Sequence, residues 1–98
     1  MIGEHVAMVK KDSNGQITWV LGIVESVTDS EQCRVAHMVS KDQIKWTFPK
    51  KANIEEVNNS DIICSNLAVK YCQTANICCT IEKKLKEKLN MEVVSLTG

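Results

Sequence analysis

The chain has 98 residues, 44% of them apolar, and its 12 Lys and Arg side chains are balanced by 12 Asp and Glu side chains. This length predicts one domain with at most a short appendage, and zero net charge argues against a dedicated DNA-binding domain, which is usually basic. Five cysteines at irregular spacings, with no secretory leader before them, predict a reducing compartment, nucleus or cytoplasm, where thiols serve mostly as small apolar side chains.

The first half of the chain predicts two strands joined by a tight turn. Side chains alternate over residues 6–10, as in a strand with one buried face. Asp12-Ser13-Asn14-Gly15 then predicts a hairpin turn, because Asn-Gly tolerates positive φ angles. Residues 17–27 are a long β-branched run, and Gly22 in its middle predicts a bend or bulge where a strand crosses a small barrel.

Three further strands follow at short spacing. Residues 33–39 alternate again, and residues 44–48 place both of their aromatic rings on one face. Pro49 ends that strand because it cannot donate a hydrogen bond to a ladder. A turn over 58–61 leads to a short strand at 62–64. The pattern therefore predicts a mainly β fold, a five-stranded antiparallel barrel over residues 1–65.

The remaining residues, 66–98, predict a C-terminal extension with an amphipathic helix over about 80–90. Thr80 can cap this helix, and Ile81, Leu85 and Leu89 form a narrow apolar stripe. Such a stripe needs a surface to lie on, either the barrel or a second copy of the chain. Residues 67–79 fit an upstream extension of the helix and a paired strand equally well.

Three segments resemble the Tudor-type domain, within the SH3-like barrels that include Agenet and chromo-barrel modules. Residues 2–7, Ile-Gly-Glu-His-Val-Ala, are similar to the entry of that family's first strand. Trp19, Gly22 and Val24 match an aromatic-x-x-small-x-aliphatic second strand, and residues 59–63 resemble the short helical turn before the last strand. The resemblance covers about residues 2–64, and similar segments occur in proteins derived from mobile elements.

The resemblance implies a groove with an aromatic cage that holds methylated lysine or arginine by cation–π attraction. The second-strand ring of such a cage falls on Trp19, and the third-strand position falls near His37, where the family usually has a ring such as Tyr. Trp46 and Phe48 can add rings from the fourth strand. The alternative for Trp19, Trp46 and Phe48 is packing in the core.

Catalysis and metal binding find little support in the sequence. Cys33 and His37 face the same way on one strand but are four residues apart, roughly 13 Å at about 3.3 Å per residue, too far for a catalytic pair. No Cys-x-x-Cys pair and no zinc spacing appears, although Cys64, Cys72 and Cys78 or Cys79 can be brought together by folding. We expect no enzyme activity, no cofactor and no metal.

The leading hypothesis is a non-enzymatic interaction module of a chromatin- or RNA-associated assembly. It would bind a protein or peptide partner, methylated or not, near Trp19, His37 and the strand-connecting loops, in a groove or at an edge strand. One alternative is a nucleic-acid-binding barrel, which would use the lysine clusters Lys10, Lys11, Lys45, Lys50 and Lys51. The other is a structural homodimer, in which Ile81, Leu85 and Leu89 meet their own copies across a two-fold axis. The sequence predicts no membrane association.

Overall fold

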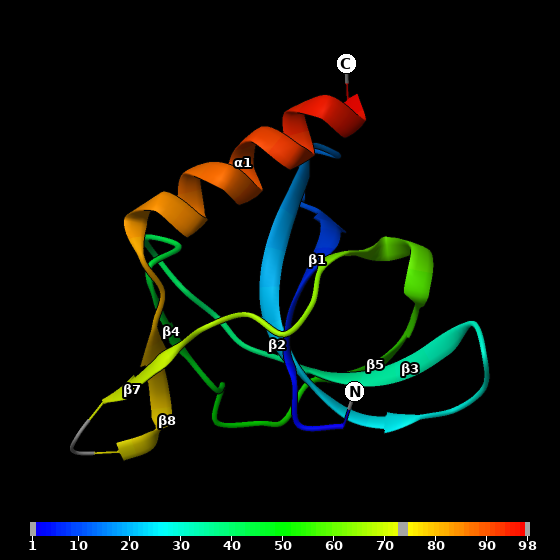
Figure 1. The fold of residues 1–98 in the computed structure, drawn as a ribbon, viewed down its shortest axis with the longest axis horizontal. Helices are drawn as coiled ribbons and strands as arrows, with labels where there is room; N and C mark the ends of the chain where they lie inside the picture. The colour runs from blue at the N-terminus through cyan, green and yellow to red at the C-terminus, as the bar shows by residue number, and fades with distance from the viewer. Residues whose placement is uncertain (1, 73–74, 98) are drawn as a thin grey trace.

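The computed structural model describes residues 2–72 and 75–97. Its elements are, in chain order, β1 (His5–Lys11), β2 (Ile17–Val27), β3 (Gln32–His37), β4 (Lys45–Thr47), β5 (Ile54–Asn58), the 3₁₀ turn η1 (Asn59–Asp61), β6 (Ile62–Cys64), β7 (Lys70–Cys72), β8 (Ala75–Thr80) and α1 (Lys83–Thr97). The expected mainly β fold with a C-terminal helix is therefore confirmed (Figure 1).

The larger sheet has the strand order β5-β3-β2-β1-β6, and its ladders are antiparallel. The predicted hairpin joins β1 to β2. Gly15 has φ +81°, and the Asp12 carboxylate accepts backbone hydrogen bonds from Asn14 and Gln16, both at 2.9 Å. The short helical turn and the last strand expected over 59–64 are present as η1 and β6, which pairs with β1.

Gly22 marks the point where β2 changes partners. Residues up to Ile23 pair with β1, and residues from Gly22 onward pair with β3. A Cβ atom on Gly22 would lie 2.5 Å from Val35 Cγ1 and 2.9 Å from the Ala36 carbonyl oxygen, so glycine is required by close packing. The irregularity in the β2–β3 ladder lies between Val24 and Ser26, slightly beyond the predicted position.

A second sheet, with the order β4-β8-β7, corrects two expectations. The predicted fourth barrel strand, residues 44–48, is the shorter β4 and pairs with β8. An isolated bridge, Val39–Thr47, links it to the chain after β3. The ambiguous segment 67–79 contains β7 and β8, with residues 73–74 and the side chains of 72–77 outside the description. β8 runs to Thr80, whose hydroxyl donates to the Lys70 carbonyl at 3.4 Å, so Thr80 belongs to a ladder and does not cap α1.

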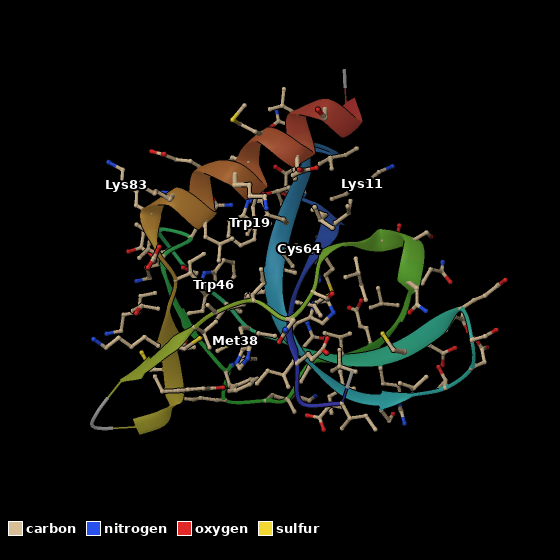
Figure 2. All side chains as sticks on the ribbon, in the orientation of Figure 1. Lys11, Trp19, Met38, Trp46, Cys64 and Lys83 are labelled. Atoms are coloured by element: carbon tan, nitrogen blue, oxygen red, sulfur yellow. The ribbon has the colours of Figure 1, made fainter. Side chains whose placement is uncertain are left out.

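The core joins the two sheets and the helix. One buried cluster contains Trp19 and Leu21 of β2, Trp46 of β4, and Leu89 and Val93 of α1. Figure 2 shows Trp19 and Trp46 beneath the helix. A second cluster, around Val6, Val24 and Val35, lies within the larger sheet. Of the two surfaces predicted for the apolar stripe, it therefore packs on the chain's own sheets. Leu89 of α1 is 0% exposed, and Ile81, just before the helix, is 5% exposed.

Candidate functional site

The most polar concavity near the predicted site residues is a hollow of about 310 Å³ between the ends of β2 and β3 and the loop before β4. We call it the central hollow. Its lining includes four predicted site residues, namely Lys10, Trp19, His37 and Trp46. The remaining lining residues are Thr18, Val20, Met38, Val39, Ser40, Gln43 and Asn53.

The two tryptophans form the apolar floor of the central hollow. Their ring centroids are 5.2 Å apart with an interplanar angle of 39°, and Trp19 and Trp46 are only 1% and 2% exposed. Trp19 Nε1 donates a 2.8 Å hydrogen bond to Asn90 Oδ1 of α1. The rings are packed on each other in this structure, so neither offers an open face to a methylated cation. Core packing, the alternative weighed for both residues, is what the structure shows.

His37 is buried at the end of β3 between two charged neighbours. Lys10 Nζ lies 3.4 Å from its Nδ1, and Glu55 Oε2 lies 3.6 Å from its Nε2. Lys10 Nζ is also 3.8 Å from Glu55 Oε1. Burial is the main cause that lowers the pKa of His37; Lys10 lowers it further and Glu55 opposes the shift. His37 is therefore neutral near pH 7.

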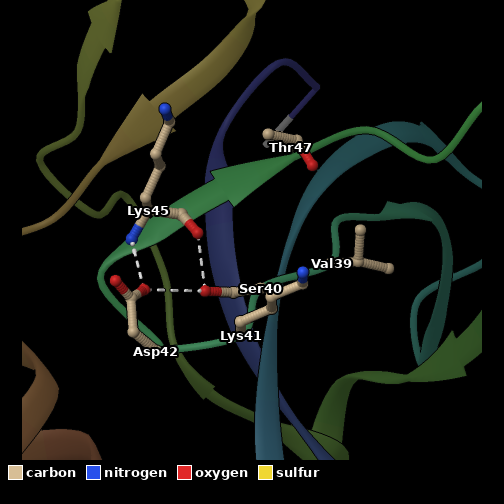
Figure 3. A pocket seen from close by; sticks show the side chains of 6 residues that line it. All are labelled: Val39, Ser40, Lys41, Asp42, Lys45 and Thr47. Carbon is tan, nitrogen blue, oxygen red and sulfur yellow. Dashed lines mark hydrogen bonds between the residues drawn. The ribbon is translucent and has the colours of Figure 1, made fainter.

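The loop between β3 and β4 forms the rim of the central hollow and is held by its own side chains. Asp42 Oδ1 accepts a backbone hydrogen bond from Ile44 at 2.9 Å. It also accepts one from Lys45 at 3.0 Å and lies 3.2 Å from the Ser40 hydroxyl (Figure 3). The hydrogen bonds from Lys45 and Ile44 lower the pKa of Asp42. Gln43 has φ +64°, an uncommon conformation for a residue with a Cβ, and this loop imposes it.

Two further hollows adjoin the central one. The first, about 490 Å³, shares Val39 and Ser40 with it and adds Lys41 and Lys45 (Figure 3). The second, about 310 Å³, shares His37 and Asn53 and adds Lys50 and Phe48. Each outer hollow thus shares two lining residues with the central one, and we call the three together the lysine band.

The predicted site residues are distributed unequally over this region. Phe48 is half-buried, packs against the core cluster and lines one end of the lysine band. Lys10, Lys45 and Lys50 each line a different hollow, whereas the exposed Lys11 and Lys51 line none of the three. The stripe residues Ile81, Leu85 and Leu89 belong to the core or pack against it.

Sequence reasoning missed Glu55, the carboxylate beside His37. None of the predicted strands included residues 50–57, which follow Pro49. In the structure Ile54–Asn58 is β5, and Glu55 pairs with Val35 of β3. Ile54 and Val57 were the available strand signal, but they do not alternate.

Metal binding and membrane insertion are two other classes of function on which the described residues bear. Within 2–72 and 75–97, no group of three or more His, Cys, Asp and Glu side chains is arranged to hold a metal ion. The predicted thiol cluster includes Cys72, whose side chain lies outside the description. In the same part of the chain, no helix has the length and apolar character needed to cross a membrane.

Comparison of the chain with protein-family models, with curated proteins and with solved structures finds no match. The lysine band and its central hollow are therefore the features of this chain that bear on its function.

Proposed function

We propose that this protein is a non-enzymatic interaction module, an SH3-like barrel of the Tudor type, that holds an extended peptide of a partner protein along the lysine band. The Tudor-type resemblance suggests that this partner belongs to a chromatin- or RNA-associated assembly in the nucleus or cytoplasm. The observation that carries the proposal is that three neighbouring hollows share lining residues.

The strand order supports the barrel part of the proposal. β1, β2, β3 and β5 are successive neighbours in one antiparallel sheet. The 3₁₀ turn η1 follows β5 directly, and β6 returns to pair with β1. This order suits an SH3-like barrel, in which the last strand follows a helical turn and meets the first. The β4, β7 and β8 sheet is an addition to that arrangement.

The chemistry of the band supports a protein ligand. Its lining includes apolar side chains such as Val39 and Phe48 and polar ones such as Gln43 and Asn53. Peptide grooves combine apolar contact area with a few polar groups that fix orientation. The closed Trp19–Trp46 pair makes methyl-mark reading the less favoured version of the proposal.

The test begins with a displayed library of seven-residue peptides selected against the immobilised full chain. A selected peptide is then titrated into ¹⁵N-labelled protein. We expect the backbone amides of Thr18, Met38 and Gln43 to shift and those of α1 to stay unchanged. Lys88→Gln on the exposed helix face is the matched control and should bind the peptide as the original chain does.

Two results would contradict the proposed function. One is a selection that enriches no peptide. The other is a set of shifts confined to α1 or to the β7 edge, which would assign binding to a different surface. Trimethyl-lysine and dimethyl-arginine peptides, each compared with its unmodified form, test the methyl-reading version separately.

Nucleic-acid binding is a second candidate, favoured by the lysines that the band gathers. Lys41, Lys45, Lys10 and Lys50 line it, against the two acids Asp42 and Glu25. If phosphates bind here, affinity for a twelve-nucleotide RNA or DNA should fall steeply as salt rises. Affinity that does not depend on salt, or no binding at low salt, would exclude this candidate.

A further inference from the structure

Two buried N–H donors lie among the residues that line the central hollow, and neither has a hydrogen-bond partner among the described residues. They are Nε2 of His37 and Nε1 of Trp46. The side chain of His37 is 6% exposed, and Trp46 is 2% exposed. A buried donor without an acceptor reduces the free energy of unfolding by about 1–3 kcal/mol. Such a group therefore calls for an explanation, and binding of a ligand acceptor is one.

The hydrogen bond from Lys10 fixes which nitrogen of His37 is the donor. A lysine ammonium only donates, so His37 Nδ1, 3.4 Å from Lys10 Nζ, must be the acceptor. The ring proton of neutral His37 is then on Nε2. Glu55 Oε2 is 3.6 Å from that nitrogen, beyond hydrogen-bonding distance. Nε2 is therefore an N–H donor held near a carboxylate but not bonded to it.

The lining of the central hollow has a one-sided charge. Among the described residues that line it, Lys10 is the only one with a permanent charge, and none is an acid. Glu55 lies outside the lining, where it faces Lys10 and His37 from β5. The lining residues thus carry one ammonium group and two N–H donors that are covered in the structure, and the Glu55 carboxylate competes for the ammonium group and for His37 from outside.

We propose that the central hollow binds the carboxylate of a Glu or Asp side chain in the partner peptide. The two N–H donors and the Lys10 ammonium would share the two carboxylate oxygens, which can accept several hydrogen bonds at once. This inference rests on the proposed function and specifies its ligand. The ligand charge is negative here, whereas an aromatic cage selects a positively charged ligand.

A single negative charge suits the hollow better than a phosphate does. Glu55 already neutralises part of the Lys10 charge at 3.8 Å, so little positive charge remains for a dianion. Both donor nitrogens are covered in the structure, so a ligand oxygen reaches them only when lining side chains move aside. We therefore expect weak binding of a one-residue probe, with a Kd of about 1 mM.

The indole N–H signals of the two tryptophans provide a direct test. The probe is the blocked tripeptide acetyl-Ala-Glu-Ala-amide, and its matched control is acetyl-Ala-Gln-Ala-amide. The Glu peptide should move the Trp46 indole signal of the full ¹⁵N-labelled chain in a saturable way. The Trp19 signal, which is already hydrogen-bonded to Asn90, should not move. An Overhauser contact to the Asn90 amide assigns Trp19 without any substitution.

Two charge variants separate a carboxylate ligand from a cationic one. Lys10→Gln should weaken binding of the Glu peptide by about twofold to fivefold, the range for a partly exposed ion pair. Glu55→Gln removes the competing carboxylate and should tighten binding by a similar factor. A methylated cation would show the opposite response to Glu55→Gln. Lys88→Gln is again the neutral control.

The inference is overturned if the Gln peptide moves the Trp46 signal as strongly as the Glu peptide, or if Glu55→Gln weakens binding. Equal or stronger shifts with inorganic phosphate would likewise reject a carboxylate in favour of a phosphoryl ligand. Library peptides that bind the lysine band without any acidic preference would leave the proposed function standing while this inference fails.

Discussion

His37 shows how one buried side chain links stability to pH. Burial and Lys10 lower its pKa below 6.5, and burial also lowers the pKa of His5. Between each histidine's folded pKa and 6.5, the unfolded chain therefore binds more protons than the folded chain. The stability that each neutral histidine preserves is fully present above pH 6.5 and is lost as pH falls through the folded pKa. Asp and Glu side chains titrate at lower pH.

We predict that the free energy of unfolding falls between pH 7 and pH 5, and that His37→Gln reduces this fall. Urea unfolding at a series of pH values, followed by tryptophan fluorescence, measures it. His5→Gln is the companion variant, because His5 contacts Tyr71 at 2.6 Å and should account for a further part of the slope. If the free energy of unfolding falls by the same amount between pH 7 and pH 5 in the double variant, neither histidine causes the pH dependence.

At the scale of the elements, α1 packs on the sheet through an apolar surface that contains one hydrogen bond. Leu89 and Val93 supply the buried face, while Asn90 accepts the Trp19 indole hydrogen bond. Lys86 Nζ donates to the Asp42 carbonyl at 2.8 Å and ties the helix to the loop before β4. The helix therefore supports the floor and the rim of the central hollow at the same time.

Asn90→Ala should destabilise the protein by about 1–3 kcal/mol, because it leaves the buried Trp19 N–H without an acceptor. Urea unfolding gives the magnitude. Met91→Ala is the matched neighbour on the same helix, and since Met91 is 73% exposed, its effect should stay within about 0.5 kcal/mol. Equal effects of the two substitutions would mean that the indole hydrogen bond contributes nothing measurable.

At the scale of the whole molecule, the two parts that were predicted to divide at residue 65 share one buried core. The cluster around Trp19 and Trp46 includes Cys79, Ile81, Leu89 and Val93 from the C-terminal third. These side chains cover the rings on the side of α1 and β8. The homodimer alternative loses its simplest basis, because Ile81 and Leu89 are already buried in their own chain.

We predict that a chain of residues 1–65 will not unfold cooperatively on its own. Without the C-terminal third its two tryptophans become exposed, so their emission should shift to longer wavelength and the fragment should bind a hydrophobic dye. The full chain, measured in parallel, should show blue-shifted emission and one transition. A sharp transition for the fragment with buried tryptophans would restore the two-part division.

Local sequence signals were sufficient wherever neighbouring residues decide the structure. Turn chemistry, β-branching and periodicity predicted four such features. They are the Asp12–Gly15 turn, the long strand through Gly22, the turn at 59–61 with its following strand, and the helix. The helix begins later than predicted because Thr80 pairs with Lys45 and Lys70 in the second sheet. It also extends further, to Thr97.

The tertiary structure decided every feature that depends on partners distant in the chain. β4 pairs with β8, although residues 45 and 80 are far apart in sequence, and β5 forms despite its two acids because β3 offers an open edge. The same long-range packing turned Trp19 and Trp46 inward and brought Glu55 to His37. The residue types around the central hollow were visible in the sequence, but burial and pairing, which determine whether it suits a cation or a carboxylate, arise only when distant strands meet.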